Sequence, residues 1–354
     1  MSTLTIALAS LGGLVLAGVV AHGAWQARKA GPKRATPNVR EEPSADAPMS
    51  SRVASAGDDG EHDNDGDGGT AALARRLSKR LPLQLDALID AFVPIELDAP
   101  VGGDAILANL PSKRHVGSKL VLVEGLDVES GQWRPLAAGE RYSELQAGVQ
   151  LASRTGALNE IEYSEFVQRM QAFAEAIGAS IDPPDMLDVM ARARELDAFA
   201  SQHDGQLAVH LHARGAAWSV GYIQQHARRH GFVPGVVAGR LVYPAAEEGA
   251  PPVLTLTFDS QAALADEPDR AAVRDVTLAF DVPQTDPAAE PFKAWQAAAQ
   301  ALAVGMDAAI VDDDERSLSS PGFEAIGAEL GKLYAALESR DLAAGSASAR
   351  RLFS

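Results

Sequence analysis

The chain of 354 residues carries a formal net charge of −17 and has a sequence pI near 4.9. Nucleic-acid binding rests on clustered Lys and Arg that displace counterions, so this acidic balance argues against a nucleic-acid partner. The chain has no cysteine, which excludes a disulfide framework, thiol catalysis and cysteine-ligated metal. Its length is sufficient for two ordinary domains and an extension.

An apolar run from Thr3 to Ala24 is long enough to span a bilayer. No basic residue precedes the run, whereas several follow it between Arg28 and Arg34. The positive-inside rule therefore predicts a transmembrane signal anchor over residues 1–25, with the N-terminus in the periplasm and the rest in the cytoplasm. A weak cleavage site at Ala21-His22-Gly23 leaves an exported protein as the alternative. Small residues at helical spacing also allow two anchors to pack together, namely Gly12, Gly13, Ala17 and Gly18.

Residues 26–80 are rich in Pro, Ala, Ser, Gly and acid, with few large apolar side chains. Such a segment cannot bury enough surface to offset its chain entropy, so we predict a disordered linker. Residues 63–68 imitate the first half of a calcium-binding loop, but Ala74 stands where the loop needs a bidentate Glu. We therefore predict a solvated acidic run there.

From residue 85 onward the chain has the periodicity of a globular α+β protein. In the segment 85–203 we predict strands over 90–97, 119–125 and 142–151, and helices over 102–110, 162–177 and 186–202. In the segment 204–340 we predict strands over 206–213, 239–244, 253–259, 274–283 and 309–311, and helices over 220–229, 292–306 and 321–337.

The helix that begins at Phe292 has the strongest helical periodicity of the chain. Trp295, Ala299, Leu302 and Met306 follow one another at steps of three or four residues, so they share one face, which we expect to be core. Aligning this helix with the one over 162–177 pairs Phe166 with Trp295, Phe173 with Leu302, Ile177 with Met306 and Ile181 with Ile310. The shared order of elements indicates a degenerate internal duplication, against the alternative of two unrelated helices in register by chance.

The stretch from Phe292 to Asp313 resembles the C-terminal domain of the ZipA cell-division family. Its pattern has a Phe opening a helix, small residues inside it, and an apolar strand that ends in Asp-Asp. The matching residues are Phe292, Ala299, Ala303, Ile310, Val311, Asp312 and Asp313. The order of anchor, low-complexity linker and final globular segment is similar as well, whereas residues 85–203 fall outside the usual family pattern and look like a diverged second copy.

The resemblance implies an inner-membrane protein that supports septum assembly at midcell. Its cytoplasmic C-terminal domain, here residues 204–340, binds the C-terminal tail of FtsZ, the tubulin-like GTPase of the division ring. The implied fold is a split β-α-β arrangement, with an antiparallel sheet, helices on one face and the FtsZ tail across the exposed face. We accordingly expect an α+β protein with two tandem copies of this fold. The alternative is a membrane-anchored interaction scaffold that is not directed at FtsZ.

Strand alternation assigns residues to the exposed face of the second copy. We predict that the FtsZ tail contacts Ala208, His210, Val237, Val253, Thr255, Thr257 and Ala279. A groove for an apolar peptide helix normally offers large hydrophobic side chains, whereas this set is mostly small or polar. Either the contact is weak or it lies elsewhere.

No group of residues predicts catalysis, so we expect no enzyme, no cofactor and no metal site. His210 and His212 point to the same side of a strand and could begin a metal site, but no third ligand is near them in sequence. The acidic run from Asp312 to Glu315 is more typical of a turn than of a magnesium site.

The C-terminal tail, residues 341–354, is basic and apolar. It is either a frayed terminus or a short docking peptide for another division protein. In the second case its anchors are Arg350, Arg351, Leu352 and Phe353.

Overall fold

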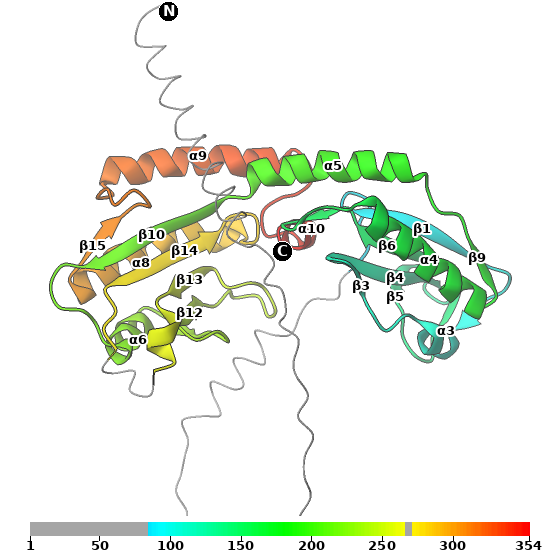
Figure 1. The fold of residues 1–354 in the computed structure, drawn as a ribbon, viewed down its shortest axis with the longest axis horizontal. Coiled ribbons are helices and arrows are strands. Elements are labelled where there is room, and N and C mark those ends of the chain that lie inside the picture. The colour runs from blue at the N-terminus through cyan, green and yellow to red at the C-terminus, as the bar shows by residue number, and fades with distance from the viewer. Residues whose placement is uncertain (1–83, 266–270) are drawn as a thin grey trace, which may run out of the picture. The chain divides into compact units, whose positions relative to one another are not determined.

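The computed structural model describes residues 84–265 and 271–354 (Figure 1). The predicted anchor over residues 1–25 and the predicted linker over residues 26–80 lie outside the described residues. Within those ranges, no helix combines the length and the apolar character needed to cross a membrane.

The described chain is a mixed α+β protein with antiparallel sheets, and its first half forms one seven-stranded sheet. The strands of this half are β1 (Asp90–Leu97), β2 (Val101–Gly102), β3 (His115–Val116), β4 (Lys119–Asp127), β5 (Trp133–Pro135), β6 (Arg141–Gln150), β7 (Ala152–Ser153), β8 (Gly156–Ala157) and β9 (Ala179–Ile181). Its helices are α3 (Gly103–Asn109), α4 (Glu160–Ala176) and α5 (Met186–His203). The first sheet has the strand order β3-β4-β6-β1-β9, with β2 paired to β6 and β5 to β4, while β7 and β8 form a separate hairpin.

The second half forms a six-stranded sheet with the order β11-β12-β13-β14-β10-β15. Its strands are β10 (Gln206–Ala213), β11 (Val233–Pro234), β12 (Arg240–Tyr243), β13 (Leu254–Thr257), β14 (Asp275–Asp281) and β15 (Ala308–Val311). Its helices are α6 (Val220–Arg229), α7 (Ser260–Ala263), a 3-10 turn η2 (Pro287–Ala289), α8 (Pro291–Met306) and α9 (Ser320–Glu338), and the chain ends with α10 (Ala347–Leu352).

The two sheets share one pairing pattern. In the first sheet β1 lies between β6 and β9, and in the second sheet β10 lies between β14 and β15, with every pairing antiparallel. In each case a long helix, α4 or α8, immediately precedes the outer strand of the three. A second long helix, α5 or α9, follows that strand.

The prediction of a buried face on α8 is confirmed. Trp295 is 1% exposed, and its indole Nε1 donates a hydrogen bond to the backbone oxygen of Leu278 at 3.0 Å. Its ring meets the rings of Phe280 and Phe323 edge to face, an arrangement that aromatic pairs favour. Ala299, Leu302 and Met306 are also buried, so this helix face supports the second sheet.

The C-terminal residues are neither frayed nor free to dock elsewhere, so both predictions for them are wrong. Leu352 and Phe353 are fully buried in the core of the first half, together with side chains of α4 and α5. Arg351 forms two hydrogen bonds to the Asp90 carboxylate, at 2.9 Å and 2.6 Å. Burial holds the pKa of Asp90 above its usual range, against the opposing effect of Arg351. The end of the chain is therefore part of the first core.

Candidate functional site

Within residues 84–265 and 271–354, the helices that pack on the second sheet lie on one of its faces. The buried strand residues have one parity and include Val209, Leu211, Leu256 and Leu278, which pack with side chains of α6, α8 and α9. The side chains of opposite parity form the other face, which we call the open face of the second sheet. It consists of Ala208, His210, His212, Val242, Thr255, Thr257, Asp275, Thr277 and Ala279.

Most of the predicted contact residues come together on this face. Ala208 lies opposite Ala279, which in turn lies opposite Thr255, so these residues form one row across β10, β14 and β13. His210 and Thr257 flank Thr277 in the next row. The side chains of both rows are small or polar, except that the first row continues from Thr255 to Val242. Val242 and Ala279 are 6% and 8% exposed.

The placement of Val253 on the open face is wrong. Val253 is 4% exposed and belongs to the core cluster of the second sheet, as does its neighbour Leu254. It precedes β13, so the alternation of the strand does not extend to it. Val237 is 59% exposed and lies in the turn between β11 and β12 rather than on a strand.

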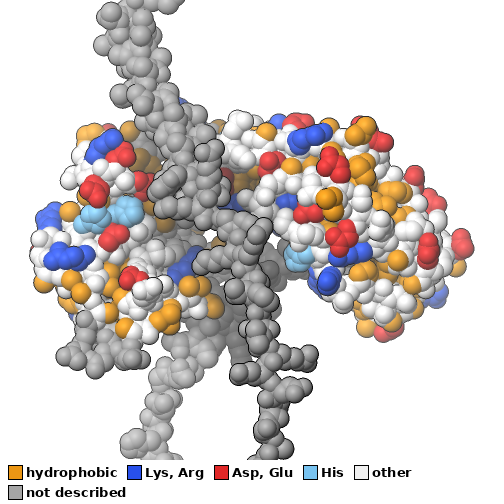
Figure 2. Space-filling view, viewed as in Figure 1, with side chains coloured by type: hydrophobic (Ala, Val, Ile, Leu, Met, Phe, Trp, Pro, Cys, Tyr) orange, Lys and Arg blue, Asp and Glu red, His pale blue; other side chains and the backbone are white. Residues whose placement is uncertain are grey.

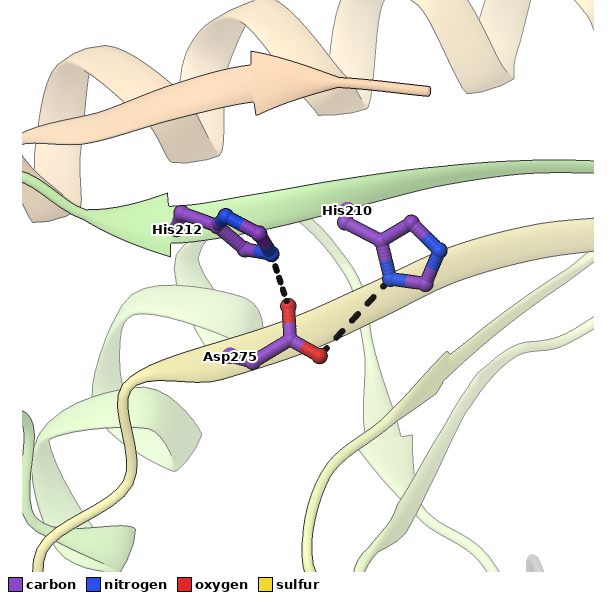
Figure 3. Close-up of side chains that lie close together, drawn as sticks. All are labelled: His210, His212 and Asp275. Atoms are coloured by element: carbon purple, nitrogen blue, oxygen red, sulfur yellow. Dashed lines mark ion pairs between the residues drawn. The ribbon is translucent and has the colours of Figure 1, made fainter. Parts of the chain in front are cut away.

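Two histidines and one aspartate converge at one end of the open face (Figure 3). His212 lies directly opposite Asp275 in the pairing of β10 with β14, and its Nε2 is 3.0 Å from Asp275 Oδ1. His210 Nδ1 is 3.7 Å from Asp275 Oδ2. On its other side, His210 Nε2 is 3.0 Å from Asp313 Oδ1. Figure 2 shows the corresponding histidine patch with acidic side chains beside it.

Sequence reasoning missed this cluster because its third member is on another strand. Asp275 is remote from His210 and His212 along the chain, and only the register of β10 against β14 brings it beside them. The available signal was the alternation of β10, which placed both histidines on one side. Without a strand pairing, that signal identifies no third ligand.

The open face of the first sheet is different. Its central row places Phe92 and Leu122 on either side of Gly148. The side chain of Leu85 lies directly over Gly148, so closely that a Cβ atom there would be 2.2 Å from Leu85 Cδ2. The backbone N–H of Leu85 also donates to Glu124 Oε1 at 2.7 Å. This row is thus an apolar groove that the chain fills with its own residue.

A pocket of about 450 Å³ adjoins β4 and α4 in the first half. Its lining combines apolar side chains, including Val121, Phe166 and Met170, with the basic Lys113 and Arg169. No local sequence pattern identifies it, because the lining residues come from separate elements.

A buried lysine and serine raise the question of nucleophilic catalysis. Lys119 is fully buried, and its Nζ donates to Ser153 Oγ, Thr155 Oγ1 and the Gly156 oxygen at 3.0, 3.1 and 2.6 Å. Burial lowers the pKa of Lys119, and the carboxylate of Glu162 opposes that change. A lysine that activates a serine must accept its proton, whereas this ammonium has an acceptor for each of its three protons. We therefore interpret it as a structural link between β4 and the β7–β8 hairpin.

No protein-family model matches this chain, and no curated protein matches it.

Proposed function

We propose that this protein is a membrane-tethered adaptor of the division ring, and that the open face of the second sheet binds the C-terminal tail of FtsZ. The observation that carries the proposal is the one-sided packing of the second sheet, in which α6, α8 and α9 contribute to a single core face. An antiparallel sheet with one face free of helices is what the resemblance at Phe292 to Asp313 implies.

In this proposal the two sheets are tandem copies of one split β-α-β fold. The support is the shared pairing, in which β1 lies between β6 and β9 and β10 lies between β14 and β15, with β9 and β15 each following a long helix. The first copy carries the extra strands β2 and β5, and the second carries β11. Residues 1–25 anchor the protein in the inner membrane, and residues 26–80 give the globular part its reach.

Peptide titration tests the binding site. A fluorescent peptide that copies the C-terminal tail of the cognate FtsZ is titrated with the full chain, and we expect a Kd in the micromolar range or weaker. The reason is that the row of Ala208, Ala279 and Thr255 offers little apolar area for an anchor residue. Full chain that does not bind the peptide at all refutes the proposal.

Matched substitutions locate the site. Thr255→Lys introduces a long charged side chain at the centre of the open face, so we expect it to weaken binding at least tenfold. Gln146→Lys makes the same kind of change on the open face of the first sheet and is expected to leave binding unchanged. If Gln146→Lys weakens binding and Thr255→Lys does not, the binding site lies on the first sheet instead.

Localisation tests the cellular role. We expect a fluorescent fusion of the full chain to gather at midcell, and the same fusion without residues 3–24 to become diffuse. An even coat over the membrane instead favours the alternative of a scaffold that is not directed at FtsZ. Recovery of a processed chain from the periplasm favours the exported protein.

A further inference from the structure

We propose that His210, His212 and Asp275 bind a divalent transition metal ion, with Zn²⁺ as the best match. The proposal goes beyond peptide binding and does not depend on it. It rests on how two strands place three side chains that are suited to one ion.

The three side chains are held by backbone pairing rather than by a loop. His210 and His212 are two residues apart on β10, so their side chains leave the same face of the sheet. Asp275 is the cross-strand partner of His212 in β14. Because the register of a buried sheet is strongly specified, the three positions are fixed relative to one another before any ion binds.

The distances fit a tetrahedral ion. Zinc binds His nitrogen and carboxylate oxygen at roughly 2.0–2.2 Å, which places neighbouring ligand atoms of a tetrahedron about 3.4 Å apart. His212 Nε2 is 3.0 Å from Asp275 Oδ1, whereas His210 Nδ1 is 3.7 Å from the other carboxylate oxygen, Oδ2, so the carboxylate must turn to present one oxygen to both rings. All three ligand atoms lie within 4.8 Å of one another. Small side-chain rotations are therefore enough to bring them around one ion.

A fourth residue, Asp313, contacts the ring nitrogen of His210 that would not bind the ion. Metal-bound histidines usually donate their second ring N–H to a carboxylate or carbonyl oxygen, which fixes the tautomer and the ring orientation. Asp313 Oδ1 is 3.0 Å from His210 Nε2, on the side of the ring away from Asp275. With the Nε2 proton donated to Asp313, the lone pair of Nδ1 is available to the ion.

Two contacts compete with the ion. His212 Nε2 must give up the proton that its 3.0 Å contact with Asp275 Oδ1 requires. The Thr277 hydroxyl is 3.2 Å from His210 Nδ1 and can donate to that nitrogen. Metal binding replaces this neutral hydrogen bond, which costs far less than displacing a buried charge. Thr277 therefore lowers the affinity without blocking the site.

The ligand chemistry selects the class of ion. Imidazole and carboxylate together suit zinc and its neighbours in the first transition row, whereas Mg²⁺ and Ca²⁺ prefer ligands that are all oxygen. The side chains of His210, His212 and Asp275 are 25%, 39% and 53% exposed. Water can therefore complete the coordination.

The test is a competition titration of the chelator-treated full chain against a chromophoric zinc indicator. We expect one high-affinity Zn²⁺ per chain that is retained in excess Mg²⁺, and Co²⁺ in its place should give the visible absorption of a tetrahedral site. Thermal unfolding of every variant checks that it is folded.

Substitutions assign the site. His212→Ala and Asp275→Asn each remove a ligand, so we expect zinc affinity to fall at least 100-fold. Asp313→Asn keeps all three ligands and is expected to cost about tenfold, as loss of an outer hydrogen bond does. His230→Ala is the control histidine and should leave the titration unchanged. Folded His212→Ala and Asp275→Asn variants that bind zinc as the parent does overturn the proposal, as does a parent chain that binds none.

Discussion

The open faces of the two sheets differ in how they limit the apolar surface that meets water. In the first sheet the central row has large apolar side chains around Gly148, and Leu85 fills the groove between them. In the second sheet the corresponding surface is small or polar, with Ala208, Ala279 and Thr255 in one row. A sheet face without helices must either be covered by the chain itself or carry side chains that water tolerates. The second face thus carries mostly small or polar side chains, and its Val242 and Ala279 are only 6% and 8% exposed.

The two cores also differ in what completes them. The second core is built from residues between Leu207 and Tyr334, a single stretch of the chain apart from residues that the structure does not describe. The first core instead recruits Leu352 and Phe353 from the end of the chain. Leu333 and Tyr334 pack against both cores, whereas Trp295 belongs to the second core alone and Leu352 to the first alone. Substitutions at residues of the latter kind damage one core at a time.

The largest expected effect is in the second core. Trp295→Ala removes a buried indole, its hydrogen bond to Leu278 and two edge-to-face ring contacts. We expect a loss on the order of 4 kcal/mol in the free energy of unfolding, measured by urea denaturation. Trp133→Ala, at a side chain that is 38% exposed, is the control and should cost less than about 0.5 kcal/mol. Equal losses for the two variants would contradict the assignment of Trp295 to the core.

The next effect is in the first core. Arg351→Ala leaves the Asp90 carboxylate buried without its cation, and we expect a loss of about 3 kcal/mol by urea denaturation. Arg316→Ala, at a side chain that is 74% exposed, is the matched arginine control. Replacing Asp90 and Arg351 together by leucine should recover most of the loss, because a buried ion pair contributes little beyond an apolar pair. No recovery in the double variant would show that the Arg351 contact to the backbone of Gln84 dominates.

Alkaline pH should act through two buried phenols. Burial raises the pKa of Tyr163 and of Tyr334 to about 12, above the ordinary tyrosine value of about 10. The unfolded chain releases these protons near pH 10 while the folded chain keeps them, so stability falls between about pH 10 and pH 12. The expected slope is about 1.4 kcal/mol per pH unit for each tyrosine.

Tyr163→Phe tests this pH dependence in the first core. Its hydroxyl donates to the Pro184 oxygen at 2.7 Å, so the variant loses that bond at every pH. Above pH 10, however, its stability should fall less steeply than that of the parent. Parallel curves for the two proteins between pH 10 and pH 12 would refute a role for this phenol.

The smallest effect concerns the groove of the first sheet. Gly148→Ala places a methyl group where Leu85 now lies, so we expect Leu85 to leave the groove at a cost of about 1 kcal/mol. Hydrogen exchange of residues 84–90 should accelerate with it. Gly331→Ala in α9, where an added Cβ meets nothing within 4 Å, is the control and should be neutral or stabilising. Unchanged exchange in Gly148→Ala would mean that Leu85 does not depend on the groove.

The long elements could be predicted from the sequence because their periodicity is local. Apolar residues three or four positions apart predict the buried face of α8. Apolar residues two positions apart predict the strand β10. Strands of two or three residues, such as β2 and β5, are too short to show a period. Val253 was misplaced because the alternation was extended beyond the end of its strand.

The parts of the site that could not be predicted are those set by strand register and by chain ends. Asp275 joins His212 only through the pairing of β10 with β14. Arg351 reaches Asp90 across 261 positions, and no pattern within either segment contains that contact.

The pairing of Arg351 with Asp90 also sets an order of events during synthesis. Asp90 leaves the ribosome well before its partner Arg351, which follows it by 261 positions. The second sheet and its helices up to Glu338 are complete before then, although N-terminal domains ordinarily fold first. The first sheet to be synthesised is thus the last to close. A chain that is cut just before Arg351 therefore carries a defect at Asp90, which is left buried without its counter-ion.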